Sequence, residues 1–160
     1  MFKAVLPLAP VARPRQRHRI VYPKGGEAFV ASYTPEDGDY GRWRQAAVLL
    51  LRAARRGAPA LAGPLGVRAV FLFAMPKGEH RVRAPRPRRW HTAKPDADNL
   101  LKAVMDAAVE AGWMADDAPV SQVEVQKIVA AQGEPESIHF TLFALPPIQA
   151  PAAPLLENGL

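Results

Sequence analysis

Apolar residues recur at helical spacing most clearly between residues 99 and 111. Leu100, Val104 and Ala108 belong to one apolar stripe there, and polar residues occupy the opposite side. Such a stripe is typical of an amphipathic helix that packs on a core. Gly112 follows the stripe and is suited to end a helix, because glycine readily adopts a left-handed backbone conformation. The segment 99–111 is therefore predicted to be a helix.

A second, less regular apolar stripe precedes Gly57. Thr34 can cap a helix there, with Pro35 at its first position and Asp37 at the third. The helix is predicted to run to about Arg56 and to end at Gly57. Glycines in its first turns weaken helix formation, so the sequence leaves the start of this helix open.

Segments with strand character outnumber the two helices. Residues 67–75 are apolar at nearly every position, as expected for a central strand that is covered on both faces. Residues 16–22 and 27–33 flank a turn rich in glycine and proline, so they predict a hairpin. The predicted strands are residues 2–6, 16–22, 27–33, 67–75, 120–129 and 138–145. The fold class follows as α/β (α+β), a single compact domain with a mixed sheet and two main helices.

Two proline-rich segments show no periodicity. Residues 76–93 are predicted to form a long exposed loop, and residues 146–160 a flexible Pro/Ala-rich C-terminal tail. The compact domain is thus expected to span residues 1–145.

Composition narrows the classes of function. The chain of 160 residues has no cysteine, which excludes a disulfide framework and thiolate zinc sites. No apolar run approaches the roughly 20 residues that span a bilayer. We therefore expect a cytoplasmic protein that has no membrane partner and no organic cofactor.

Charge is strongly segregated along the chain. Residues 1–95 hold 19 Lys and Arg against 5 Asp and Glu, whereas residues 96–160 hold 2 against 10. A basic surface beside concentrated carboxylates favours a nucleic-acid partner over general solubility. The candidate DNA-binding residues are Arg13, Arg15, Arg17, Arg19, Arg81, Arg83, Arg86, Arg88, Arg89 and Lys94. Trp90 and His91 could stack on an unpaired base, but Trp90 is more simply interpreted as a partly buried anchor of the loop.

Carboxylates cluster on either side of the helix predicted at 99–111. Pro95 favours extended backbone before it, and side chains alternate in an extended chain, so Asp96 and Asp98 can converge. Asp98 can also cap a helix that starts at Asn99. Magnesium prefers oxygen ligands of this kind, and a magnesium-held water can hydrolyse phosphodiesters.

Each part of this pattern also has a simpler interpretation. Asp96 and Asp98 could serve only as a cap and a turn, and Asp116-Asp117 as a solvated turn. Asp98 and Lys102 could form an ordinary surface pair worth about 0.2–0.5 kcal/mol. The combination is more specific than any single part.

The segment KPDADNLLKAVMDA…AGWMADDA, residues 94–118, closely resembles the signature of RusA-type Holliday junction resolvases. The resemblance implies catalytic aspartates Asp96, Asp98 and Asp117 that bind Mg²⁺, with Mn²⁺ as a substitute, and Lys102 as the catalytic lysine. It implies a homodimer that resolves four-way DNA junctions by paired symmetric nicks. Pro119 departs from the family pattern, and the basic insert 76–93 is longer than expected.

Several alternatives remain open from the sequence. The protein could be a structure-selective nuclease of flaps or other branched DNA, or a junction-binding protein without catalysis. A 13-residue helix is about 20 Å long, so the residues after Gly112 can bring Asp117 back to Asp98 only by running nearly fully extended. Either the segment doubles back tightly, or the helix bends away, or the site is completed across the dimer.

Overall fold

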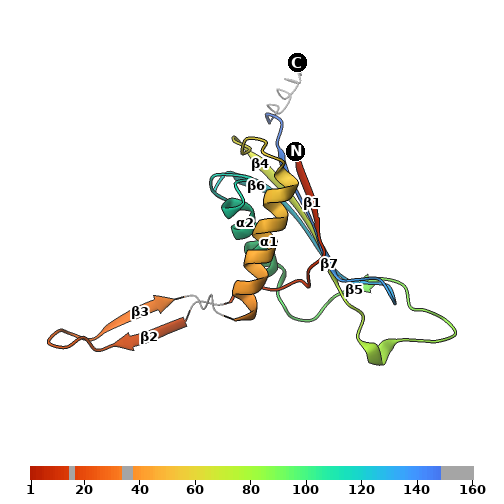
Figure 1. The fold of residues 1–160 in the computed structure, drawn as a ribbon, viewed down its shortest axis with the longest axis horizontal. Coiled ribbons are helices and arrows are strands. Elements are labelled where there is room, and N and C mark those ends of the chain that lie inside the picture. The colour runs from red at the N-terminus through yellow and green to blue at the C-terminus, as the bar shows by residue number, and fades with distance from the viewer. Residues whose placement is uncertain (15–16, 34–37, 149–160) are drawn as a thin grey trace, which may run out of the picture.

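A computed structural model describes residues 1–14, 17–33 and 38–148 of the chain (Figure 1). Two helices and seven strands make up this part, together with one 3₁₀ turn at Lys77–Glu79. The helices are α1 (Asp39–Arg55) and α2 (Ala97–Glu110), and the strands are β1 (Phe2–Leu6), β2 (Arg17–Val21), β3 (Phe29–Tyr33), β4 (Leu65–Phe73), β5 (Arg89–Trp90), β6 (Val120–Val129) and β7 (Ser137–Ala144). All six predicted strands and both predicted helices are therefore present.

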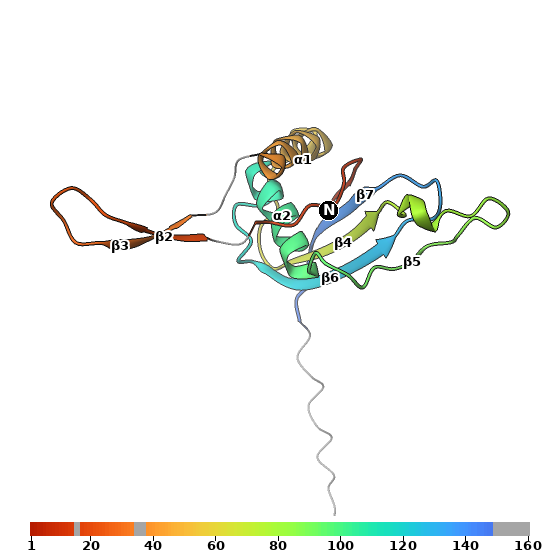
Figure 2. The ribbon, with the colours of Figure 1, turned by 90° about the horizontal axis from the view of Figure 1, so that it is seen from below.

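Five strands form one mixed sheet in the order β1-β7-β4-β6-β5. Strands β4 and β6 pair in parallel, and the other neighbours pair antiparallel. Strand β4 is central, as predicted. Both helices lie on one face of the sheet (Figure 2), and Arg68 on the other face of β4 is exposed, so the expectation that this strand is covered on both faces is wrong. A parallel pair needs a crossover connection, and α2 lies in the connection from β4 to β6. The predicted mixed α+β domain is confirmed.

Both helices lie on the same face of the sheet, α1 beside β1 and α2 beside β6 (Figure 2). Strand residues at alternate positions face them, among them Val67, Phe71 and Phe140, which are at most 1% exposed. Leu100 and Val104 of α2 complete this core and are fully buried. Within the described ranges, neither helix has the length and apolar character needed to cross a bilayer.

Two segments project from opposite ends of the molecule (Figures 1 and 2). At one end, β2 and β3 form the predicted antiparallel hairpin, with Ile20, Tyr22 and Val30 at least 60% exposed. At the other end lies the segment 76–93, named here the basic arm. It is mostly exposed, as predicted, and within it lie the 3₁₀ turn and the two-residue strand β5, which the sequence did not indicate.

Helix α1 begins later than expected in the described chain. Its first residue is Asp39, after Gly38, whose φ of 80° is incompatible with a helix. The predicted cap Thr34 and its followers Pro35 and Asp37 lie outside the described residues. Of the predicted tail, residues 146–148 are exposed and have no secondary structure, and residues 149–160 also lie outside the described part.

Trp113 joins the turn after α2 to both layers of the core. Its ring is fully buried and lies 5.2 Å from the ring of Phe2, and its Nε1 donates to the carbonyl of Leu51 at 2.8 Å. We expect Trp113→Ala to lower the free energy of unfolding by about 3–5 kcal/mol, because it leaves a large cavity in the core and removes the hydrogen bond to Leu51. Urea unfolding followed by circular dichroism measures this. Trp90→Ala is the matched control: Trp90 is 66% exposed, so a change beyond about 0.5 kcal/mol would contradict the assignment.

Candidate active site

The first turn of α2 carries two of the predicted catalytic carboxylates. Asp96 is the N-cap residue, with extended φ and ψ of −72° and 147°, and its carbonyl accepts the first helical bond from Leu100 at 3.2 Å. Asp98 lies inside the helix. The predictions that the helix starts at Asn99 and that Asp98 caps it are therefore wrong, because the extended backbone reaches only as far as Asp96. Both carboxylates are exposed at the helix end that favours negative charge.

Lys102 lies one turn further along α2 and contacts two carboxylates. Its Nζ forms an ion pair with Asp106 at 2.9 Å and donates a hydrogen bond to Oδ2 of Asp117. Hydrogen bonding to Asp117 raises the pKa of Lys102. The sequence suggested a surface pair between Asp98 and Lys102. In the structure Lys102 instead pairs with Asp106, four residues after it. Lys102 thus links α2 to the segment that precedes β6.

Asp117 reaches Lys102 because the chain doubles back after α2. Gly112 has a φ of 78°, and Trp113 donates its backbone N–H to Ala108 at 2.9 Å, which reverses the chain. A side chain at Gly112 would also collide with Arg55, whose Nη1 lies 2.2 Å from an ideal Cβ position. This tight reversal within one chain brings Asp117 to Lys102 of α2.

Asp117 has an unusual environment for a carboxylate. The hydrogen bond from Lys102 lowers the pKa of Asp117, and partial burial opposes this effect. The bond engages one of its two carboxylate oxygens. Asp116 accepts a hydrogen bond from the Asp117 backbone N–H at 2.6 Å and is itself exposed. The structure therefore makes Asp117, and not Asp116, the ionised partner of Lys102.

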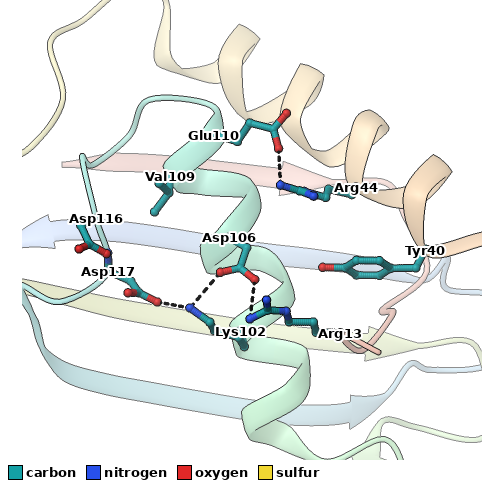
Figure 3. Close-up of a pocket in the computed structure, with 9 residues that line it drawn as sticks. All are labelled: Arg13, Tyr40, Arg44, Lys102, Asp106, Val109, Glu110, Asp116 and Asp117. Carbon is teal, nitrogen blue, oxygen red and sulfur yellow. Dashed lines mark hydrogen bonds and ion pairs between the residues drawn. The ribbon is translucent and has the colours of Figure 1, made fainter. Parts of the chain in front are cut away.

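These residues line a cavity of about 330 Å³ between α1, α2 and the N-terminal segment (Figure 3). Asp106 lies between two cations, because it contacts Arg13 at 3.2 Å as well as Lys102. The residues that line the cavity are Arg13, Tyr40, Arg44, Lys102, Asp106, Val109, Glu110, Asp116 and Asp117. Positive and negative side chains alternate around it.

A second, larger hollow of about 590 Å³ adjoins the N-terminus of α2. Arg13 lines both hollows, and its backbone N–H donates to the carbonyl of Asn99 at 3.1 Å. The second hollow is also lined by Lys94 and Asp96. Two cations thus flank one of the predicted catalytic aspartates.

The three predicted metal ligands do not converge into one cluster. Among the described residues, no group of three or more His, Asp or Glu side chains is placed to share a metal ion. The chemistry of the donors still fits Mg²⁺, which is held by one or two carboxylates together with waters and substrate phosphate. The metal-binding roles of Asp96, Asp98 and Asp117 remain predictions.

Ion pairs hold the basic arm in place. Arg89 donates to both carboxylate oxygens of Glu79 at 2.8 and 2.9 Å, and Arg86 lies 3.8 Å from the same group. Arg88 binds Glu134, with Nε 2.9 Å from Oε2, and this contact lowers the pKa of Glu134. Three predicted DNA-binding arginines of the arm therefore already have carboxylate partners, and Arg13 likewise pairs with Asp106.

Four of the remaining predicted DNA-binding residues lie at the surface. Arg19, Arg81, Arg83 and Lys94 are exposed. Arg15 lies outside the described residues, and the side chain of Arg17 is not described. Contact of any of these residues with DNA stays a prediction.

The aromatic residues of the arm differ from their expected roles. Trp90 is 66% exposed, so its interpretation as a partly buried anchor is wrong. The ring of His91 stacks on Phe73 with centroids 4.0 Å apart, and burial lowers the pKa of His91. His91 is thereby engaged within the protein, whereas the face of Trp90 is open to a partner.

Two features of the site were missed from the sequence. Asp106 had no assigned role, although its spacing of four residues from Lys102 could have revealed the pair. Lys127 reaches the segment before α2 with its side chain, and its Nζ donates to the carbonyl of Pro95 at 2.6 Å. No local pattern signals that contact, because 32 residues separate the partners.

One family model matches most of the chain. The family model described as Endodeoxyribonuclease RusA matches residues 7–136, which include α1, α2, Lys102 and Asp117. No curated protein gives a significant match to the chain. Since the matched range covers most of the 160 residues, this protein belongs to the RusA endodeoxyribonuclease family.

Proposed function

We propose that this protein resolves four-way DNA junctions by Mg²⁺-dependent hydrolysis of phosphodiester bonds, and that it acts as a homodimer making paired symmetric nicks. The observation that carries the proposal is the bond from Lys102 to Asp117. It joins two residues that the family signature assigns to catalysis, 15 positions apart in the chain. It also lies one helical turn from Asp98.

Each side chain of the site has a role in this proposal. Asp96, Asp98 and Asp117 would hold the metal, which supplies charge neutralisation at the scissile phosphate and an activated water. Lys102 would stabilise the negative charge that develops on the phosphate oxygens, because its ammonium group is positively charged. The bond to Asp117 raises its pKa further. Asp106 holds Lys102 in position from the far side.

Cations around the site favour a phosphate backbone as the substrate. Arg13 and Lys94 line the hollow beside Asp96, so they can bind phosphates next to the one that is cut. Contacts of this kind do not read base sequence, which suits recognition of DNA shape. A two-fold-symmetric junction presents two equivalent strands, and a dimer with two equivalent sites can cut both.

The test is cleavage of labelled synthetic DNA with Mg²⁺ and with Mn²⁺. A four-way junction, a 5′ flap, a fork and a linear duplex of the same sequence should be compared at equal concentration. We expect paired nicks at symmetric positions in the junction and little cutting of linear duplex. Preferential cutting of flaps or forks would replace this proposal by a structure-selective nuclease. Binding of the junction without cutting in either metal would support a role without catalysis.

A further inference from the structure

Lys127 lies on β6, and its side chain is on the face of the sheet that carries the helices. It is paired in register with Phe71, which is buried in the core, so its side chain extends toward the helices. Its Nζ donates to the carbonyls of Ala93 and Pro95 at 2.7 and 2.6 Å. The backbone carbonyl of Lys127 accepts a further bond from the N–H of His91 at 3.0 Å. One residue thus holds the segment that enters α2 at three points.

The position of the Lys127 ammonium group, close to the N-terminus of α2, is electrostatically unfavourable. A positive charge near the N-terminus of a helix opposes the helix dipole. Within the described part of the chain, the partners found for its ammonium group are the backbone carbonyls of Ala93 and Pro95, and none is a carboxylate. Lysine is easily accommodated at the surface, and this half-buried one instead caps an irregular turn.

The bond to Pro95 acts directly on the next residue. The carbonyl of Pro95 and the N–H of Asp96 belong to the same planar peptide group. Fixing the carbonyl oxygen therefore fixes the orientation of the peptide that leads into Asp96. Together with the extended conformation of Asp96, at φ −72°, it determines where the Cα–Cβ bond of Asp96 points.

We propose that Lys127 is a positioning residue, which clamps the backbone at residues 93–95 and thereby aims the Asp96 carboxylate. The inference rests on the proposed function, in which Asp96 is a metal ligand. Lys127 itself touches neither metal nor DNA in this assignment. Its effect should therefore appear in the metal requirement and in the backbone of Asp96, with little effect on turnover once metal is saturating.

The experiment compares Lys127→Met with Lys127→Arg, which retains charge and donors. Lys3→Met serves as the control, because Lys3 is an exposed lysine of the same sheet. Two quantities are measured in each variant: the three-bond HN–Hα coupling of Asp96 by NMR, which reports its φ angle, and Mn²⁺ affinity of the DNA-free protein by titration calorimetry. Junction cleavage is then measured against Mg²⁺ concentration. Thermal unfolding verifies that each variant is folded.

For Lys127→Met we expect a changed or averaged Asp96 coupling and metal affinity weaker by about 10–100-fold, as for other groups that orient a metal ligand. The Mg²⁺ concentration for half-maximal cleavage should rise by the same factor, while kcat at saturating Mg²⁺ stays within about threefold of the native value. Lys127→Arg should recover most of the affinity, and Lys3→Met should match the native protein.

Two results overturn the inference separately from the proposed function. If the native protein binds Mn²⁺ and Lys127→Met binds it equally well with an unchanged Asp96 coupling, Lys127 does not position Asp96. A lower kcat at saturating Mg²⁺ with unchanged affinity would also overturn it. If the native protein itself neither binds Mn²⁺ nor cuts DNA, the proposed function fails, and the Asp96 coupling alone decides whether Lys127 aims that side chain.

Discussion

Replacing Asp98 by asparagine is expected to reduce junction cleavage by more than about 100-fold while leaving junction binding intact. Replacing a group that only orients a metal ligand lowers metal affinity or activity by about 10–100-fold. Loss of a ligand itself should lower activity by more than that. Asparagine keeps the size of the side chain and removes its charge. Single-turnover cleavage of a labelled junction, with a gel-shift measurement of binding, tests both parts.

Asp39→Asn is the matched control for this variant. Asp39 occupies the first turn of α1 as Asp98 occupies that of α2, and it is exposed. Loss of either charge at a helix N-terminus should lower stability by only about 0.3–1 kcal/mol, which is too little to remove activity. If the two variants cut equally well, Asp98 has no place in the mechanism and the family resemblance misassigns it.

Replacing Lys102 by methionine should lower the cleavage rate by about 10²–10³-fold, the effect of removing one donor to a developing oxyanion. The same change should raise the pKa of Asp117, because the bond from Lys102 is the main cause of its lowered value. A carbon-detected NMR titration of the Asp117 carboxyl group measures this pKa. Lys102→Arg should keep the pKa of Asp117 low, since it retains charge and donors.

The Lys102–Asp117 pair also has a defined pH window. The pKa of Asp117 is lowered by folding, so its stabilisation is present above the ordinary aspartate pKa of about 3.9 and is lost as pH falls through the lower folded value. The pKa of Lys102 is raised, so its contribution is lost only as pH rises above about 10.4 through the higher folded value. Both groups are partly exposed, which screens the pair. An unchanged Asp117 pKa in Lys102→Met would contradict the contact.

The sequence predicted the elements well where their signals are local. The apolar stripe that includes Leu100 and Val104 predicts a helix without knowledge of its surroundings. The continuous apolar run at 67–75 likewise predicts a central strand. The start of α2 was misplaced by two residues. Its first residue is Ala97, and the hydrogen bonds that fix the backbone before it come from Lys127, which is remote in the sequence.

Contacts between distant residues explain what the sequence did not reveal. The sequence of the basic arm is that of a loop because its contacts with the domain are remote: β5 pairs with β6, and Glu134 lies 46 residues from its partner Arg88. The return of Asp117 to α2 depends on a chain reversal whose direction has no signature beyond Gly112. By contrast, the candidate catalytic residues could be named from the resemblance to the family signature, because that signature is contiguous over 25 residues, 94–118.

The basic arm is joined to the domain at both of its ends, so the length of the arm should not affect the geometry of the candidate site. It leaves after β4, where Ala130 donates to the carbonyl of Phe73 at 2.8 Å, and it returns through β5, which pairs with the same end of β6. Both ends are therefore fastened to one strand before α2 begins. We therefore expect that an arm of another length, joined at these two points, would leave Asp96 in its place relative to Asp117. Changes in the arm would then alter its contacts with a partner and leave the geometry of the candidate site unchanged.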